Sequence, residues 1–130
     1  MKIKDIYKAE KLSGNDSLVE WHNNVIEKTE AELTVLDVAR CIRQNLFVET
    51  AYEMLIVYLL QDPFAGDMYP GELMEKAGDV EEEIIRRHSQ SLKDVINKAE
   101  LFIKENKWEL EDEREEYLES VNTLKKKIED

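Results

Sequence analysis

Large apolar side chains recur along this chain at intervals of three and four residues and rarely form alternating runs. That spacing places them on one face of an α-helix, which repeats every 3.6 residues, whereas a strand needs a period of two. The periodic stretches are 2–12, 17–26, 34–46, 47–61, 72–77, 79–105 and 107–128, and turn residues separate most of them. The stretch 47–61 either continues the helix of 34–46 or starts a new one. The pattern predicts an all-α helical bundle of about five to seven helices, and a chain of this length fits a single domain over residues 1–130.

Short polar pairs mark the expected helix starts. Ser17 with Glu20, and Thr34 with Asp37, have the spacing of a capping box, in which a hydroxyl accepts from an early backbone amide and a carboxylate reaches back. The same spacing at 79–82 predicts a further start. Within the stretch that follows, the serines at 89–91 predict a bend, and Asn106 predicts the end of the helix.

Residues 47–61 are apolar on almost every side, because Ile56, Val57 and Leu60 widen the apolar stripe. A helix that is apolar all round is usually central in a bundle. Directly after it comes QDPFAGDMYPGEL, residues 61–73, with both prolines and two of the four glycines of the chain. Proline and glycine end helices and form turns, so this segment is expected to stop the central helix and reverse the chain.

The charge of the chain is strongly negative. Lys and Arg number 18 and Asp and Glu number 30, which gives a net charge of −12. That exceeds the roughly 2–8 units that solubility requires of a small domain. A negative field disfavours binding to phosphate backbones and favours fast capture of a cationic protein. A generic acidic protein stays open as an interpretation, since net charge bears on association and not on fold.

Cysteine content and hydropathy bear on the compartment. Cys41 is the only cysteine, so an intrachain disulfide is excluded and a reducing compartment is expected. The first 12 residues lack the apolar core of a signal peptide. The longest apolar run, 54–60, is too short to cross a bilayer. These features predict a cytoplasmic protein without membrane contact.

The chain shows no arrangement of residues typical of catalysis. His22 and His88 lie in different expected helices, without an HExxH pair or the Glu-x-x-His spacing of di-iron bundles. His88 falls on an apolar stripe, which favours a packing role. Cys41 has arginines nearby in sequence, but its flank on the apolar stripe favours an unreactive, half-buried thiol. We therefore expect no enzyme, no catalytic residue, and no metal or cofactor.

Clustered acidic residues keep a second interpretation open. The runs at 81–83 and 109–119 are similar to the carboxylate clusters with which all-α nucleotide pyrophosphatases hold magnesium. Three positions after 81–83 stand Ile84, Ile85 and Arg86, which breaks the one-face arrangement of such a site. A metal-dependent helical hydrolase stays an alternative, as does a helical adaptor or homodimer that uses the apolar stripe of 110–128.

One stretch resembles a known family. The segment LTVLDVARCIRQNLFVETAYEMLIVYLLQDPFAGDMYPGEL, residues 33–73, covers about a third of the chain. It resembles bacterial immunity proteins of contact-dependent growth inhibition (CDI) systems, which have a polar helical motif, an apolar helix and then a loop with Pro and Gly. The matching residues are Asp37, Arg40, Ile42, Arg43, Gln44, Asn45, Asp62, Pro63, Ala65, Gly66, Asp67, Tyr69, Gly71, Glu72 and Leu73.

The resemblance implies an inhibitor that is made in the cytoplasm and binds the toxic C-terminal domain of a large secreted exoprotein. Many such toxins are nucleases with basic substrate sites, and a charge of −12 suits such a target independently of the family. The expected mode is stoichiometric occlusion by a monomer that forms a 1:1 heterodimer, with no direct contact to nucleic acid.

Two groups of residues are expected to carry these roles. Family-wide motifs usually hold a fold, and polar groups at helix ends need partners. A structural role is therefore expected for Asp37, Arg43, Gln44, Asn45, Asp62, Pro63, Gly66, Tyr69 and Gly71. Partner contacts are expected from freer acidic side chains, namely Asp67, Glu72, Glu81, Glu82 and Glu83. The acidic run at 109–119 competes with these as a binding surface.

Overall fold

The computed structural model describes residues 1–129 and confirms the all-α prediction. Within that range it has eight α-helices, one 3-10 helix and no strand. In chain order they are α1 Ile3–Tyr7, α2 Ser17–Val25, η1 Glu30–Glu32, α3 Val35–Arg43, α4 Val48–Gln61, α5 Glu72–Ala77, α6 Glu82–Arg87, α7 Ser89–Glu105 and α8 Glu111–Glu129. The count exceeds the expected range by one, because the predicted bend is a full break at His88 that separates α6 from α7.

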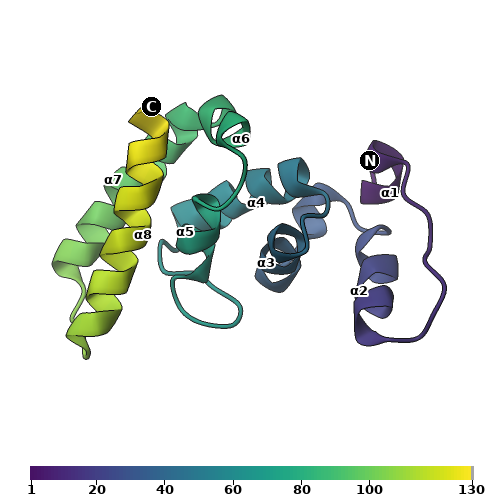
Figure 1. The fold of residues 1–130 in the computed structure, drawn as a ribbon, viewed down its shortest axis with the longest axis horizontal. Helices are drawn as coiled ribbons and strands as arrows, with labels where there is room; N and C mark the ends of the chain where they lie inside the picture. Colours follow the sequence, from purple (N-terminus) through teal and green to yellow (C-terminus); the bar gives the residue numbers. More distant parts are fainter. Residues whose placement is uncertain (130) are drawn as a thin grey trace.

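The α4 helix is central, as its apolar circumference predicts. It packs against η1, α3, α5 and α7, while α8 covers α5, α6 and α7. In Figure 1, α7 and α8 lie together at one end of the molecule, α3, α4 and α5 occupy the middle, and α1 and α2 form the opposite end. The side chains of α4 that are fully buried are Ala51, Tyr52, Leu55 and Leu59.

Local capping explains where several helices begin. At α3 the predicted box is present, since the Asp37 amide donates to Thr34 Oγ1 at 3.1 Å and the Thr34 amide donates to Asp37 Oδ2 at 3.0 Å. The α2 start was misplaced by one residue, because Asp16, and not Ser17, accepts from the Val19 amide. The predicted cap at 79–82 is wrong, since α6 begins at Glu82 without a side-chain cap.

Asp37 also links α3 to α2 and to the segment that follows α2, through side-chain hydrogen bonds. It is 3% exposed, and it accepts from Trp21 Nε1 at 3.0 Å and from Lys28 Nζ at 2.6 Å. Burial raises the pKa of this carboxyl, but the hydrogen bonds from Lys28, Thr34 and Trp21 outweigh burial and hold the pKa below its ordinary value. The α1 helix that precedes these residues is shorter than predicted, because the chain turns left-handed at Lys8 (φ 53°).

No helix within residues 1–129 is both long enough and apolar enough to span a membrane.

Candidate partner-binding surface

The loop between α4 and α5 is organised around one buried carboxylate. Glu72, the first residue of α5, is only 1% exposed. Its Oε1 accepts from the backbone amides of Asp67 and Met68, each at 3.0 Å. Its Oε2 accepts from Nη1 of Arg43 at 2.6 Å. Three donors thus satisfy a charge whose burial alone would be strongly unfavourable.

The cation that pairs with Glu72 is Arg43, the last residue of α3. Its Nη2 also lies 3.6 Å from Asp67 Oδ2. Burial raises the pKa of Glu72, but the two amides and Arg43 outweigh it, so the net pKa lies below its ordinary value. The expectation that Glu72 faces a partner is wrong, because its carboxylate is enclosed and fully used. Asp67 keeps 23% of its side chain exposed beside Arg43, and its contact role stays a prediction.

The residues after Arg43 turn the chain from α3 into α4. The Gln44 amide donates to the Arg40 carbonyl at 2.9 Å, and the Asn45 amide donates to the Ile42 carbonyl at 3.1 Å. Asn45 is left-handed at φ 55°, a conformation that asparagine tolerates better than most residues. Both side chains are exposed, so these two residues join the helices through their backbone.

The loop glycines are required by close approach. A Cβ on Gly66 would lie 1.9 Å from the Tyr69 carbonyl oxygen, so no other residue fits without moving the loop. Gly71 has φ +88°, and a Cβ there would lie 3.1 Å from Phe64 and 3.2 Å from Tyr117. Both glycines therefore let the loop fold tightly over its own aromatic base.

That base consists of aromatic side chains from four segments, namely the loop itself, α7, the α7–α8 connection and α8. Asp62 Oδ1 accepts from the Phe64 amide at 2.9 Å and sets the first turn of the loop. The buried Pro63 offers its carbonyl to the Tyr117 hydroxyl of α8. Burial raises the pKa of Tyr117 above its ordinary value, so the hydroxyl keeps the proton that it donates. Around Phe64 and Tyr117, with ring centroids 5.2 to 6.0 Å apart, lie Phe102 and Trp108.

The tip of the loop is exposed and apolar. Met68 is 71% exposed and Tyr69 is 41% exposed. Burial, a hydrogen bond to Glu75 and the nearby carboxylates raise the pKa of Tyr69, so its phenol stays protonated. The hydroxyl of Tyr69 thus fits the expected structural role, while the residue as a whole is partly exposed to the solvent.

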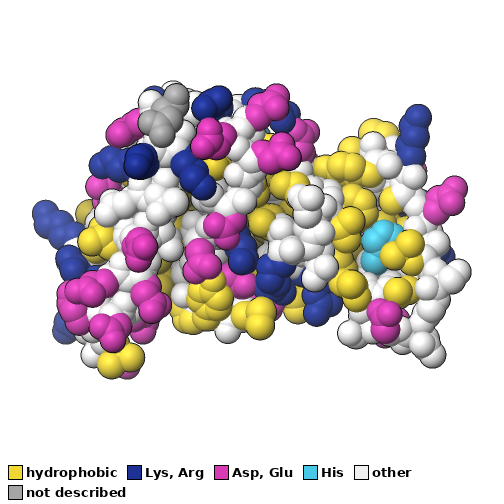
Figure 2. Space-filling view, in the orientation of Figure 1, with side chains coloured by type: hydrophobic (Ala, Val, Ile, Leu, Met, Phe, Trp, Pro, Cys, Tyr) yellow, Lys and Arg dark blue, Asp and Glu magenta, His cyan; other side chains and the backbone are white. Residues whose placement is uncertain are grey.

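Beside this tip lies an acidic face formed by α5 and α8. Residues 109–119 contain seven acidic residues and a single Arg, which is half of the net charge of the chain. Figure 2 shows acidic side chains gathered over the first half of α8. We define the acidic face as Glu75, Glu113, Glu116 and Glu119, which line two adjoining hollows, one shared with Tyr69. Among residues 1–129, no Lys or Arg forms an ion pair with any of these four.

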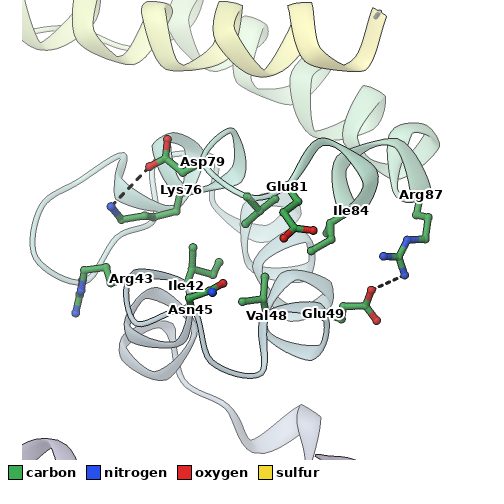
Figure 3. A pocket seen from close by; sticks show the side chains of 11 residues that line it. Ile42, Arg43, Asn45, Val48, Glu49, Lys76, Asp79, Glu81, Ile84 and Arg87 are labelled. Carbon is green, nitrogen blue, oxygen red and sulfur yellow. Dashed lines mark ion pairs between the residues drawn. The ribbon is translucent and has the colours of Figure 1, made fainter.

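The predicted contact residues at 81–83 are exposed but more nearly neutralised. Glu82 lies 3.1 Å from Arg86, and Glu83 lies 4.0 Å from Arg87, which also pairs with Glu49. Figure 3 shows Glu81 on the wall of a cleft of about 650 Å³ between the α3–α4 turn and the α5–α6 connection. The charges along this cleft are of both signs, and two of its cations are paired within it, Lys76 with Asp79 and Arg87 with Glu49.

The residues considered for chemistry are dispersed through the fold. The His22 ring packs 5.8 Å from Phe47, and the His88 ring packs 5.5 Å from Tyr52. Cys41 is fully buried, more than the half-buried thiol predicted, and burial followed by the charge of Asp37 raises its pKa to about 12. Within residues 1–129, no three His, Cys, Asp or Glu side chains are grouped so that they could hold a metal ion.

Sequence reasoning did not single out Met68 or Glu75. An apolar residue in an irregular loop has no periodicity that reports its exposure, and an isolated Glu on a short helix resembles any solvated residue. The only usable signal was the acidic run of 109–119, which marks the face of α8 that Glu75 adjoins.

Comparison with known proteins identifies the family of the chain. The profile of a family described as CDI immunity proteins matches residues 2–95. No curated protein and no solved structure matches the chain. The matched segment includes the whole loop and ends inside α7, so α8 lies outside it.

Proposed function

This chain belongs to the CDI immunity protein family, whose role is toxin neutralisation, and we propose that it occludes one cationic toxin domain in a 1:1 complex. The toxin is a nuclease, and the inhibitor acts in the cytoplasm without turnover. Carboxylates on the inhibitor take the place that nucleic-acid phosphates would occupy on the basic substrate site.

The observation that carries this proposal is the unpaired charge of the acidic face. Glu113, Glu116 and Glu119 follow one another at helical spacing on α8, and the structure gives none of them an ion pair among residues 1–129. Unpaired like charges on one face repel each other, and a cationic partner relieves that repulsion. Charged rims of this kind act mostly on the association rate, and increasing salt concentration weakens them.

The position of α8 fits a role in selectivity. The family profile matches residues 2–95, whereas the acidic helix α8 lies outside the match. Related inhibitors that share a framework must still discriminate between toxins, and discrimination resides in groups that differ between them. The run 81–83 and Asp67 remain additional contact candidates, with 81–83 weaker because Arg86 and Arg87 offset its charge.

The test compares two triple variants with equal charge change. One replaces Glu113, Glu116 and Glu119 by Gln, and the other replaces the three glutamates at 81–83 by Gln. Association with the cognate toxin domain is followed by stopped flow at several salt concentrations. We expect the α8 variant to associate about tenfold more slowly at low salt and to lose most of its salt dependence, and the 81–83 variant to change less.

Three results would contradict parts of this proposal. Equal rates for the wild type and the α8 variant would remove the acidic face from the contact. A larger effect of the 81–83 variant would move the contact to the cleft side of the molecule. No binding of the wild-type protein would overturn the proposed function itself.

A further inference from the structure

We propose that the loop tip, Met68 and Tyr69, is a preorganised anchor that enters an apolar pocket of the toxin domain, a pocket rimmed by Lys and Arg. This inference rests on the proposed function and names the element that holds the complex together once charge has brought the partners into contact.

The first argument is that the backbone of the tip is fixed from below. The two amides bound by Glu72 are those of Met68, the first tip residue, and of Asp67, which directly precedes the tip. Glu72 is held in turn by Arg43, and Gly66 permits a backbone approach that no side chain would allow. The buried carboxylate of Glu72 thus holds the backbone at Met68, whose side chain is exposed.

The second argument concerns what this fixed backbone displays. Met68 exposes 71% of its surface and Tyr69 exposes 41%. Single exposed apolar residues are ordinary, but two adjacent ones on a constrained loop lose little further backbone entropy on binding. Methionine and tyrosine are also enriched at the centres of protein interfaces, where a few buried side chains supply most of the binding energy.

The third argument is the charge that surrounds the tip. Tyr69 shares a hollow with Glu75, Glu113 and Glu116. An apolar centre with an acidic rim complements an apolar pocket with a basic rim. The occupant is therefore the toxin domain and not a second copy of this chain, whose own acidic rim would repel the first.

Arg43 and Glu72 are positioning residues in this scheme, because they hold the tip without touching the partner. Their contribution to binding is the ordering of the amides of Asp67 and Met68. Loss of Arg43 would therefore increase hydrogen exchange at these two amides in the free protein and also speed dissociation.

The test uses the double variant Met68→Ser with Tyr69→Ser and a matched control, Leu101→Ser with Leu18→Ser. The control residues are 53% and 41% exposed and lie on α7 and α2. Binding to the cognate toxin domain is followed by biolayer interferometry, and thermal unfolding shows that each variant is folded. We expect the tip variant to dissociate about a hundredfold faster with an association rate within threefold of the wild type. The control is expected to stay within threefold in both rates.

Arg43→Met and Arg43→Lys extend the test to the positioning pair. At a temperature where both are fully folded, the Met variant is expected to dissociate about tenfold faster with loss of amide protection at the tip, and the Lys variant to recover part of both. A tip variant that dissociates at the wild-type rate would overturn the anchor and leave the proposed function standing. A wild-type protein that fails to bind the domain would overturn both.

Discussion

Replacing Arg43 by Met tests how much the buried ion pair beneath the loop contributes to stability. The change removes the only cationic partner that Glu72, which is 1% exposed, has among residues 1–129, and leaves two backbone amides to satisfy its charge. Breaking a buried pair costs about 3–5 kcal/mol. The Arg43 side chain is 22% exposed, so water can replace part of what it donates, and we expect a loss of about 2–3 kcal/mol.

Glu72→Gln should cost less than Arg43→Met. The amide oxygen of Gln can still accept from the two backbone amides, but its NH₂ group would face the guanidinium, so we expect a loss of about 1–2 kcal/mol. In the double variant no buried charge remains unpaired, and the combined loss should fall short of the sum by about 1.5 kcal/mol. Against a total stability of roughly 5–15 kcal/mol, these are large effects.

The assay is urea unfolding at pH 7 followed by far-UV circular dichroism. For a chain of this size the Arg43 variant should lower the urea midpoint by roughly 1–2 M without a change of slope. Arg87→Met is the matched control, because Arg87 and Glu49 form an exposed pair with side chains 51% and 54% exposed. Exposed pairs contribute about 0–1 kcal/mol.

The pH dependence adds an independent check. The folded-state pKa of Glu72 is lowered, so its contribution is present above the ordinary value of 4.5 and is lost as the pH falls through the folded-state value. The difference between the wild type and Glu72→Gln should therefore shrink in acid. Single variants that cost no more than the Arg87 control, or that add without coupling, would refute the assignment of this pair as the centre of the loop.

Three further predictions concern other parts of the fold. Gly66→Ala should cost at least about 3 kcal/mol of unfolding free energy, whereas Gly78→Ala, whose Cβ would have no atom nearer than 3.6 Å, should cost under about 1 kcal/mol in the same urea assay. The hydrogen bond between Glu30 and Glu53, together with burial, raises the pKa of Glu30 to about 7. The protonated form of Glu30 therefore stabilises the fold fully below pH 4.5, and this contribution is lost as the pH rises through about 7. After solvent screening we expect a wild-type loss of about 1 kcal/mol between pH 5 and pH 8 that is absent in Glu30→Gln, and equal pH profiles would contradict this. The fully buried Cys41 should resist iodoacetamide at pH 8 until urea unfolds the chain. Alkylated Cys41 in the native protein, detected by mass spectrometry, would contradict this prediction.

Features set by neighbours in sequence could be predicted from the sequence. The capping box at 34–37 depends on residues three apart, and the end of α4 depends on Pro63 two positions after Gln61. The central place of α4 follows from its apolar circumference. In each case the cause lies within one or two helical turns of its effect.

Features set by distant residues could not be predicted in this way. Glu72 looked like a free surface carboxylate, because nothing local shows that Arg43, 29 positions earlier, would lie against it. Tyr117 reaches the Pro63 carbonyl across 54 positions, and no periodicity signals that contact. The position of Met68 depends on both contacts, so only the three-dimensional structure identifies it as part of a candidate anchor.

The most direct test of a stoichiometric inhibitor of a cationic toxin is a calorimetric titration with the cognate toxin domain. The account predicts saturation at one domain per chain and an affinity that falls steadily as sodium chloride is added. Absence of saturable binding, or an affinity that salt leaves unchanged, would contradict it.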